Sequence, residues 1–355
     1  MIMSKALGPK DAPKALLKHI DDSYLNAGSR GEVVGALLLL LARDAAIRDR
    51  KTPKPSVNAP PQDLKFDDDT QGRIITVLEF LDALVPPSSR GYVRMQKPIR
   101  CSPGYKLSIP LKSAFAKAHI YFNHFIKVHD FKVVNRQYIW RIFCRGAAVI
   151  CTNNQRGVDI LIPMLMGRVL RPQCITAILI QVKNDSHFSD KLCKPLFDIM
   201  DPFEIKLFSK DDAKAPLPPI LRIVFSLASK RSDVIARTPP DRRSPCLKSK
   251  DKFTTYDLWI AGVSKKSFGV ISDKQSSSQY KILLDRTRGI FNGYGVVAKD
   301  GGELDDEEQP RIDLRCMMHA AAASKDMHYQ NYIDLEDTAS TIHNYVIEEY
   351  LEDDV

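Results

Sequence analysis

Three polar residues interrupt or close the most apolar stretches of the chain. Asp159 lies in the run GVDILI (157–162), and Gln181 and Lys183 close the run AILIQVK (177–183). Successive side chains of a β-strand point to opposite faces, so Gln181 and Lys183 share a face. If the two runs are neighbouring strands, Asp159 reaches the same edge. The pattern then brings together a carboxylate, an amide oxygen and an ammonium group.

This combination suits the hydrolysis of phosphodiester bonds with a divalent cation. Mg²⁺ prefers oxygen ligands and keeps bound waters, and it offsets the charge that develops on the phosphate. We expect Asp159, Gln181 and the main-chain carbonyl of Val182 to hold Mg²⁺ or Mn²⁺. Lys183 would assist the attacking water or stabilise the transition state as a fixed charge. A structural role, in which Asp159 ends a hairpin and Lys183 caps a strand edge, also explains the bare pattern.

The elements around these residues read as a hairpin followed by buried strands. The apolar runs 147–151 and 158–165 are separated by the turn-forming letters TNNQRG, which predicts a β-hairpin. The nearly continuous apolar run 175–182 predicts a strand that is buried on both faces. A helix is expected over 191–199 and another buried strand over 220–227.

The N-terminal part of the chain reads as helical. Ser29 and Glu32 form an S-x-x-E capping box directly before the apolar run 33–42, which predicts a helix that starts there and is buried on most sides. That run is about half as long as a membrane-spanning helix must be. A loop is expected over 51–69, and a second helix over 73–84.

Two further segments carry aromatic residues. Between 116 and 126, apolar and aromatic residues recur at helical spacing, which predicts a helix. Over 131–143 aromatic residues alternate with basic ones, and either a helix or a strand fits. Arg136, Arg141 and Arg145 suit a basic groove with stacking aromatic rings. An amphipathic element with aromatic residues inward and arginines outward fits as well.

The charge is distributed unevenly along the chain. The formal net charge is +9, but the segment 301–355 holds fifteen Asp or Glu against three Lys or Arg, which is −12 and leaves +21 on 1–300. A basic body suits a polyanionic partner, because Lys and Arg contacts to phosphates release counterions. A soluble surface that happens to be basic is the simpler alternative.

Signal and thiol patterns bear on the compartment. The first residues lack the basic start and apolar core of a secretory signal. The seven cysteines are odd in number and form no C-x-x-C pair, which indicates reduced thiols. We therefore expect an intracellular protein, nuclear or cytoplasmic. Nucleotide-binding glycine-rich loops, zinc signatures, nucleophile elbows and haem motifs are absent from the sequence.

The arrangement resembles the PD-(D/E)XK nuclease superfamily, and most closely the Mrr-type branch of restriction endonucleases. The core of that branch reads as a Glu-bearing helix, then G-[VI]-D on one strand and Q-x-K on the next. Here the matching segments are GEVVGALL (31–38) with Glu32, then GVD (157–159), then QVK (181–183). The whole chain also looks like a group of proteins from mushroom-forming fungi, a likeness that carries no known function.

The resemblance implies an α/β (α+β) fold in which helices flank a restriction-endonuclease-like central mixed sheet, with a long helical insertion after the first helix. It implies a Mg²⁺- or Mn²⁺-dependent nuclease acting on DNA, with Glu32 as a further catalytic residue. The chain would form one domain over 1–300, followed by an acidic C-terminal region over 301–355. The expected parts of the domain are first helices over 1–50, an insertion over 51–130, the core over 131–230 and closing elements over 253–300.

Nucleic-acid contacts are expected on both sides of the core strands. Asn154, Gln155 and Arg156 lie in the hairpin turn before Asp159, although Asn is also a common turn former. Lys191 and Lys194 lie on the predicted helix after the Gln-x-Lys strand, where this fold tends to meet the nucleic-acid backbone, and are expected to contact it.

Two other functions remain open. Gln181 is neutral where many members of the superfamily have Glu, so the metal would be held weakly. This favours a module that kept the fold, lost turnover, and binds nucleic acid or a protein. The chain would otherwise be a fungal defence or mobile-element accessory protein acting through protein contacts, in which the basic segment 229–252 is a nuclear address and the acidic tail a docking strip.

Overall fold

The computed structural model of the protein describes residues 12–14, 16, 27–49, 73–102, 105–106, 108–128, 130–152, 157–185, 188, 191–209, 211–212, 216–239 and 252–284. The chain divides into two compact units, Met1–Arg288 and Gly289–Val355, and every described residue lies in the first. Predictions about the acidic region 301–355 therefore lie outside the described residues. The same holds for Asn154, Gln155 and Arg156.

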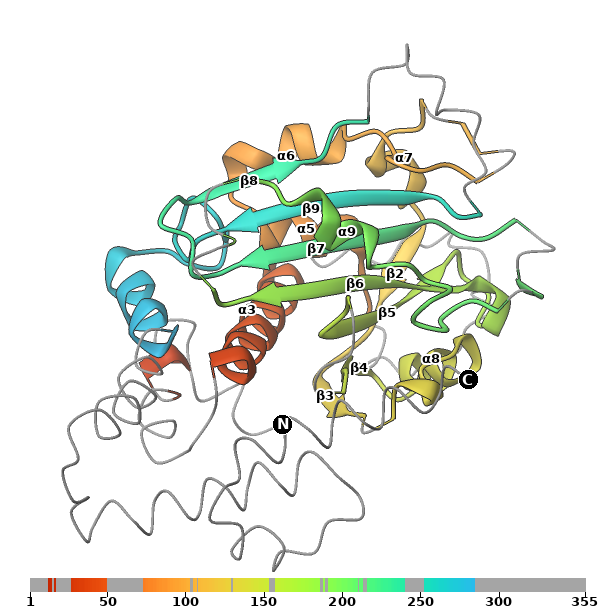
Figure 1. Ribbon diagram of the computed structural model, residues 1–355, viewed down its shortest axis with the longest axis horizontal. Helices are drawn as coiled ribbons and strands as arrows, with labels where there is room; N and C mark the ends of the chain where they lie inside the picture. The colour runs from red at the N-terminus through yellow and green to blue at the C-terminus, as the bar shows by residue number, and fades with distance from the viewer. Residues whose placement is uncertain are drawn as a thin grey trace, which may run out of the picture. The chain divides into compact units, whose positions relative to one another are not determined.

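A mixed sheet of nine strands forms the centre of the described unit (Figure 1). Its order is β1-β2-β5-β6-β7-β9-β8, and β4 pairs with both β5 and β3. The parallel strands β6, β7 and β9 form its middle, and β5 and β8 flank them in the antiparallel sense. The strands are β1 (Ile75–Thr76), β2 (Ala118–Ile120), β3 (His124–Lys127), β4 (Ala147–Ile150), β5 (Ile160–Met166), β6 (Ile175–Lys183), β7 (Ile220–Ser226), β8 (Asp233–Ala236) and β9 (Thr255–Ala261).

Helices pack on both faces of this sheet. One apolar core joins α3, α5 and the helix over 274–284 to Ile160, Ile178 and Ile180. A second core, on the opposite face, joins α8 and α9 to Leu161 and Leu179. The helices are α3 (Ala27–Asp49), α5 (Val77–Leu84), α6 (Pro87–Arg94), α7 (Leu111–Ala114), α8 (Arg136–Cys144) and α9 (Lys194–Asp198). The predicted α/β class, with a central mixed sheet flanked by helices, is confirmed.

The alternation of the two cores along β6 explains its composition. Ile178 and Ile180 point into the first core and Leu179 into the second, and all three are fully buried. A strand covered on both faces must be apolar at every position, because successive side chains point in opposite directions. The predicted hairpin and the predicted strands over 175–182 and 220–227 are confirmed as β4, β5, β6 and β7.

The predicted helix over 116–126 is wrong, because the structure has β2 and β3 there. Ala118, Ile120 and Phe122 recur at a spacing of two and are all fully buried, which is the period of a strand. β2 pairs with β5, and β3 pairs with β4. The predicted insertion after the first helix is therefore only partly helical, since its strands extend the central sheet.

The predicted start of the first long helix also needs correction. α3 already contains Ala27, so Ser29 lies inside the helix and is not the residue that precedes its first turn. The capping box of the structure belongs to α5: Glu79 N–H donates to Thr76 Oγ1 at 3.1 Å, and Thr76 N–H donates to Glu79 Oε2 at 2.7 Å. Glu32 consequently needs another explanation than helix capping.

Two further features of the described residues concern membranes and thiols. No helix within the described ranges combines the length and the apolar character that crossing a bilayer demands. The cysteines that the structure describes are reduced thiols, as the sequence predicts: Cys101, Cys144, Cys151, Cys174 and Cys193.

Candidate functional site

Asp159 lies at the point where β5 begins, between the ends of β4 and β6. Its main-chain N–H donates to Ile180 O at 2.9 Å, and its carbonyl accepts from Cys151 N–H at 2.8 Å. The β5–β6 pairing ends at Ile160 opposite Ile180. Beyond this pair the Asp159 carboxylate takes the place of a main-chain acceptor, because its Oδ2 accepts the Val182 N–H at 2.6 Å. Its Oδ1 has no hydrogen bond to any residue that the structure describes.

Gly157 explains why the chain can leave the sheet at this point. Its φ of +88° is a left-handed conformation that side chains other than hydrogen disfavour. A Cβ at this position would also lie 2.4 Å from the carbonyl oxygen of Ile199, which follows α9. Val158 is fully buried in the second core and anchors the turn. In the sequence Gly-Val-Asp, Gly157 thus allows the chain to turn, Val158 fixes it in the core, and Asp159 directs its carboxylate toward the end of β6.

Glu32 reaches the site because the start of α3 packs against the end of β6. A Cβ on Gly31 would lie 3.0 Å from Asn184 Cβ, and one on Gly35 would lie 3.1 Å from Val182 Cγ2. Glycine at both positions favours this close approach, because an added Cβ would force the side chains of the strand to shift by a few tenths of an ångström. Glu32 lies between the two glycines and interacts electrostatically with Asp159. The structure therefore brings the two carboxylates together, although 126 residues lie between them in the sequence.

The electrostatics of the two carboxylates favour a cation. Burial, with the nearby Asp159 carboxylate, raises the pKa of Glu32 to about 7. Burial also raises the pKa of Asp159, although the Val182 N–H and the Lys183 ammonium favour its ionised form. Burial, together with both carboxylates, raises the pKa of the adjacent Cys151 thiol. Two partly desolvated carboxylates repel each other when ionised, and a divalent cation between them would remove that repulsion.

Gln181 adds a buried oxygen that has no partner. The residue is only 3% exposed, and its Oε1 accepts no hydrogen bond. An unsatisfied buried acceptor costs about 1–3 kcal/mol, so such an atom calls for an explanation. A bound cation would supply the missing partner. The Val182 carbonyl, the other predicted ligand on β6, belongs to the same strand end.

Two lysines lie around the carboxylates. Lys183 is half-buried, its Nζ lies 5.6 Å from the ring centroid of Phe188, and its charge acts on Asp159. Lys127 at the end of β3 acts on Glu32. The register aligns Lys127 with Ile150 of β4, which in turn faces Ile160 of β5. Lys127 was not predicted from the sequence, because no local pattern indicates that β3 lies beside β4.

The structure describes some of the residues that were predicted to contact nucleic acid. Lys191 is exposed, and Lys194 is exposed at the start of α9, which is shorter than predicted. Arg141 on α8 and Arg145 directly after it are exposed, and Phe143 on α8 is buried, which matches the amphipathic alternative. Roles for these residues in nucleic-acid binding stay predictions. Arg136, the third arginine of the predicted groove, forms an ion pair with an aspartate, Asp212, at 2.9 Å.

The ligand set of the candidate site differs from a conventional metal cluster. Within the described ranges, no group of three or more His, Cys, Asp or Glu side chains is arranged to hold a metal ion. The candidate site offers two carboxylates, and its other oxygens come from an amide and a main-chain carbonyl. A cation bound there would meet hard oxygen ligands but little negative charge.

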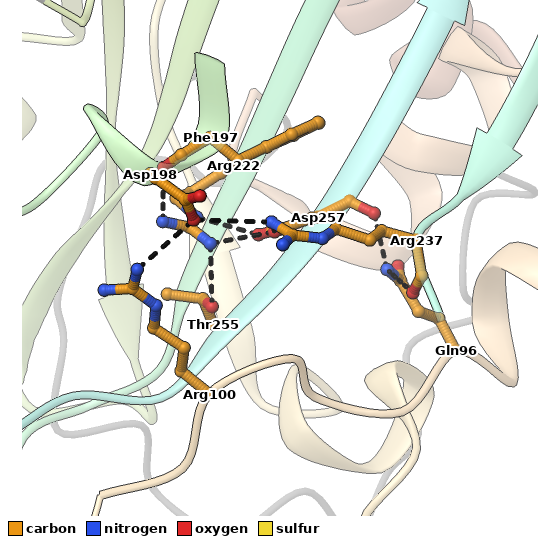
Figure 2. Close-up of polar contacts among 8 residues, drawn as sticks. All are labelled: Gln96, Arg100, Phe197, Asp198, Arg222, Arg237, Thr255 and Asp257. Atoms are coloured by element: carbon orange, nitrogen blue, oxygen red, sulfur yellow. Dashed lines mark hydrogen bonds and ion pairs between the residues drawn. The ribbon is translucent and has the colours of Figure 1, made fainter. Parts of the chain in front are cut away.

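A second polar cluster, which the sequence did not predict, lies on β7 and β9 (Figure 2). The register aligns its Arg222 with Leu179 of β6, two residues before Gln181. Arg222 on β7 and Asp257 on β9 are both fully buried and share hydrogen bonds of 2.7 and 2.8 Å. Arg222 also donates to Phe197 O at 2.6 Å, and Arg237 donates to Asp257 at 3.0 Å. All three guanidinium nitrogens of Arg222 have partners. This closed network holds α9 on the sheet, whereas the site at Asp159 leaves oxygen atoms open to a ligand.

Comparison of the chain with family models, with curated proteins and with solved structures finds no match.

Proposed function

We propose that this chain is a metal-dependent nuclease that hydrolyses phosphodiester bonds in DNA. One observation carries the proposal: α3, β5 and β6 bring Glu32, Asp159, Gln181 and Lys183 to one end of the sheet. The order of a Glu-bearing helix, an Asp-bearing strand and a Gln-x-Lys strand is the order of the Mrr-type core. The restriction-endonuclease-like version of the mixed fold is part of this proposal.

The residues present fit a divalent metal. Asp159 Oδ1, the Glu32 carboxylate, Gln181 Oε1 and the Val182 carbonyl would hold Mg²⁺ or Mn²⁺. The support is the unpartnered Gln181 oxygen and the two carboxylates whose pKa values burial raises. When bound, such an ion polarises water for attack and offsets the charge that develops on the phosphate.

The chain's own residues would orient the reactants. The Val182 N–H fixes the Asp159 carboxylate through a hydrogen bond of 2.6 Å, so Oδ1 keeps a constant direction. The Lys183 ammonium lies over the Phe188 ring and beside Asp159, where it would hold the attacking water or a phosphate oxygen. Lys127 adds a second cation on the β3 side.

A second candidate is a module of the same fold that binds nucleic acid or a protein without turnover. The neutral Gln181 favours it, as does the pKa of about 7 for Glu32, since both reduce the negative charge that holds a metal near neutral pH. Metal affinity then separates the two candidates less well than turnover does.

The test is cleavage of supercoiled plasmid in Mg²⁺ or Mn²⁺ by wild type, Asp159→Asn and Asp201→Asn. Asn keeps an oxygen acceptor for the Val182 N–H, whereas Ala would leave that buried donor unpaired. Asp201 is the matched control, because its carboxylate also accepts a main-chain N–H, from Phe203 at 2.8 Å, but lies outside the site. We expect cleavage by wild type and Asp201→Asn and none by Asp159→Asn.

Other outcomes decide between the candidates. A wild type that binds DNA but cuts it with neither metal supports the inactive module. Equal cleavage by wild type and Asp159→Asn would exclude this site as the catalytic centre.

A further inference from the structure

A lysine-rich pocket of about 330 Å³ lies beyond the carboxyl ends of β7 and β9. Its walls are the segment after β7, the segment after β9 and the start of the helix over 274–284, which Figure 1 draws in blue beside that edge of the sheet. The lining residues are Lys230, Ser232, Ser264, Lys265, Lys266, Asp273, Lys274 and Ser277. The carboxyl edge of an open α/β sheet is where ligands commonly bind.

Close packing holds the walls of this pocket in place. Gly262, directly after β9, has a φ of +68°, and a Cβ there would lie 2.4 Å from the carbonyl oxygen of Arg231. The two strand-end segments are therefore in direct contact. Ser277 Oγ donates to Val263 O at 2.7 Å, which ties the helix to the segment after β9. The pocket is thus formed by the fold itself.

The charge of the pocket is strongly positive. Four lysines line it with a single carboxylate, that of Asp273, so the formal charge is +3. Asp273 caps the helix, because its Oδ1 accepts the Ser276 N–H at 2.7 Å. None of the four ammonium groups forms an ion pair with another residue that the structure describes. Like charges gathered in one place repel each other, and a polyanion relieves that repulsion.

The pocket and the candidate catalytic site lie along the same edge. The register aligns Lys183 at the end of β6 with Ser226 on β7, and Ser226 with Ala261 on β9. Hydrogen bonds continue this alignment beyond the strands, from Leu227 N–H to Lys183 O at 2.8 Å and from Gly262 N–H to Ser226 O at 2.8 Å. Two strand spacings, about 10 Å, separate Lys183 from the end of β9.

We propose that this lysine pocket is a second phosphate-binding site, which takes backbone phosphates of the DNA that lies across the candidate catalytic site. The proposal rests on the proposed function for the identity of the polyanion. The ammonium groups of Lys230, Lys265, Lys266 and Lys274 would contact the phosphates. The Ser264 hydroxyl accepts the Lys266 N–H, so its own proton is free to be donated to a phosphate oxygen.

The experiment measures binding of a fluorescein-labelled 20-base-pair DNA in EDTA, so that neither metal binding nor cleavage contributes. The pocket variant replaces its four lysines by Gln. The control variant replaces four other exposed lysines by Gln and so has the same net charge: Lys97, Lys112, Lys117 and Lys132. Thermal unfolding of both variants verifies that they fold.

We expect the pocket variant to reduce the magnitude of the slope of log affinity against log salt by about 3.6, since each of the four lost phosphate contacts removes about 0.9. The control should lower it by less than about 1. Equal losses in the two variants, or wild-type binding by the pocket variant, would overturn the proposal. Unchanged DNA affinity in the pocket variant, together with loss of the binding of inorganic phosphate measured by calorimetry, would show that the pocket is a small-anion site and would also overturn the proposal.

The two proposals fail in different ways. Wild-type DNA binding by the pocket variant, together with cleavage by the wild type in Mn²⁺, rejects the pocket and keeps the nuclease. Loss of binding in the pocket variant alone, with no cleavage by the wild type, keeps the pocket as a DNA-binding site and rejects the nuclease.

Discussion

Glu32 is the residue whose ionisation should report most directly on the site. Its pKa of about 7 in the folded protein lies above the ordinary 4.5, because of burial and the adjacent Asp159. The folded state then binds the proton more tightly than the unfolded chain does. This group's contribution to stability is therefore unfavourable at high pH: it lowers the free energy of unfolding as the pH rises from about 4.5 to 7.

The corresponding prediction concerns Glu32→Gln without metal. The variant should be more stable than wild type by about 1–2 kcal/mol at pH 8, after allowance for partial exposure of the carboxyl, and equally stable near pH 4. Urea unfolding in EDTA at both pH values measures the difference. Glu204→Gln, at an exposed glutamate, is the control and should show no such pH dependence. A constant difference between Glu32→Gln and wild type at all pH values would contradict the burial of this carboxylate.

The positions of some candidate site residues follow more directly from the sequence than those of others, for physical reasons. Gln181 and Lys183 share a strand, so their common face follows from a period of two. The prediction that Asp159 lies beside them required only that the runs 157–162 and 177–183 form neighbouring strands. Glu32 was expected only from the family resemblance, since its local pattern indicated a helix cap. Lys127 depends on a parallel pairing of β3 with β4, which no local signal reveals.

Among the connecting elements, the turn before β5 makes a stringent prediction. Gly157→Ala should destabilise the protein by about 1–3 kcal/mol and weaken metal binding, because the new Cβ meets Ile199 O and displaces Asp159. Gly167→Ala is the matched control: its φ of +83° is equally left-handed, but its new Cβ would have open space for 4 Å around it. Urea unfolding and Mn²⁺ titration of both variants measure the effect. Identical behaviour of the two would show that the contact with Ile199 is unimportant.

The buried network beneath α9 makes a prediction about stability alone. Arg222→Met should cost about 3–5 kcal/mol, since it leaves Asp257 buried without its main partner, and metal affinity should not change. Arg100→Met removes a more exposed ion pair, of 3.2 Å to Asp198, and should cost less than about 1 kcal/mol. Denaturant unfolding compares them. A small effect of Arg222→Met would mean that the network does not hold the fold.

Elements were predictable where burial alone determines the pattern. β5, β6 and β7 are largely apolar runs, so their positions followed from composition. β2 and β3 are three and four residues long, and their strand conformation depends on pairing with β5 and β4. Local apolar spacing over so few residues fits a helix and a strand alike.

At the scale of the whole molecule, charge separation along the chain makes a further prediction. From the sequence alone we predict that the acidic segment competes with DNA for the basic body, because attached groups act at high effective concentration. Neutralising its first acidic run should raise DNA affinity at low salt and steepen the salt dependence, as more lysines become free to displace counterions. Fluorescence anisotropy in EDTA measures this. Unchanged affinity would exclude masking by this run, which is Glu303, Asp305, Asp306, Glu307 and Glu308.

The most direct test of the central claim is calorimetric titration of the protein with Mn²⁺. The claim is that Asp159 and Gln181 present oxygen ligands to one divalent cation. Wild type should bind one Mn²⁺ weakly, Asp159→Asn should lose binding, and Gln181→Glu should bind more tightly, because a carboxylate adds a full negative charge where the amide offers a dipole. The same affinity in all three proteins, or no binding by any of them, would contradict the existence of the metal site.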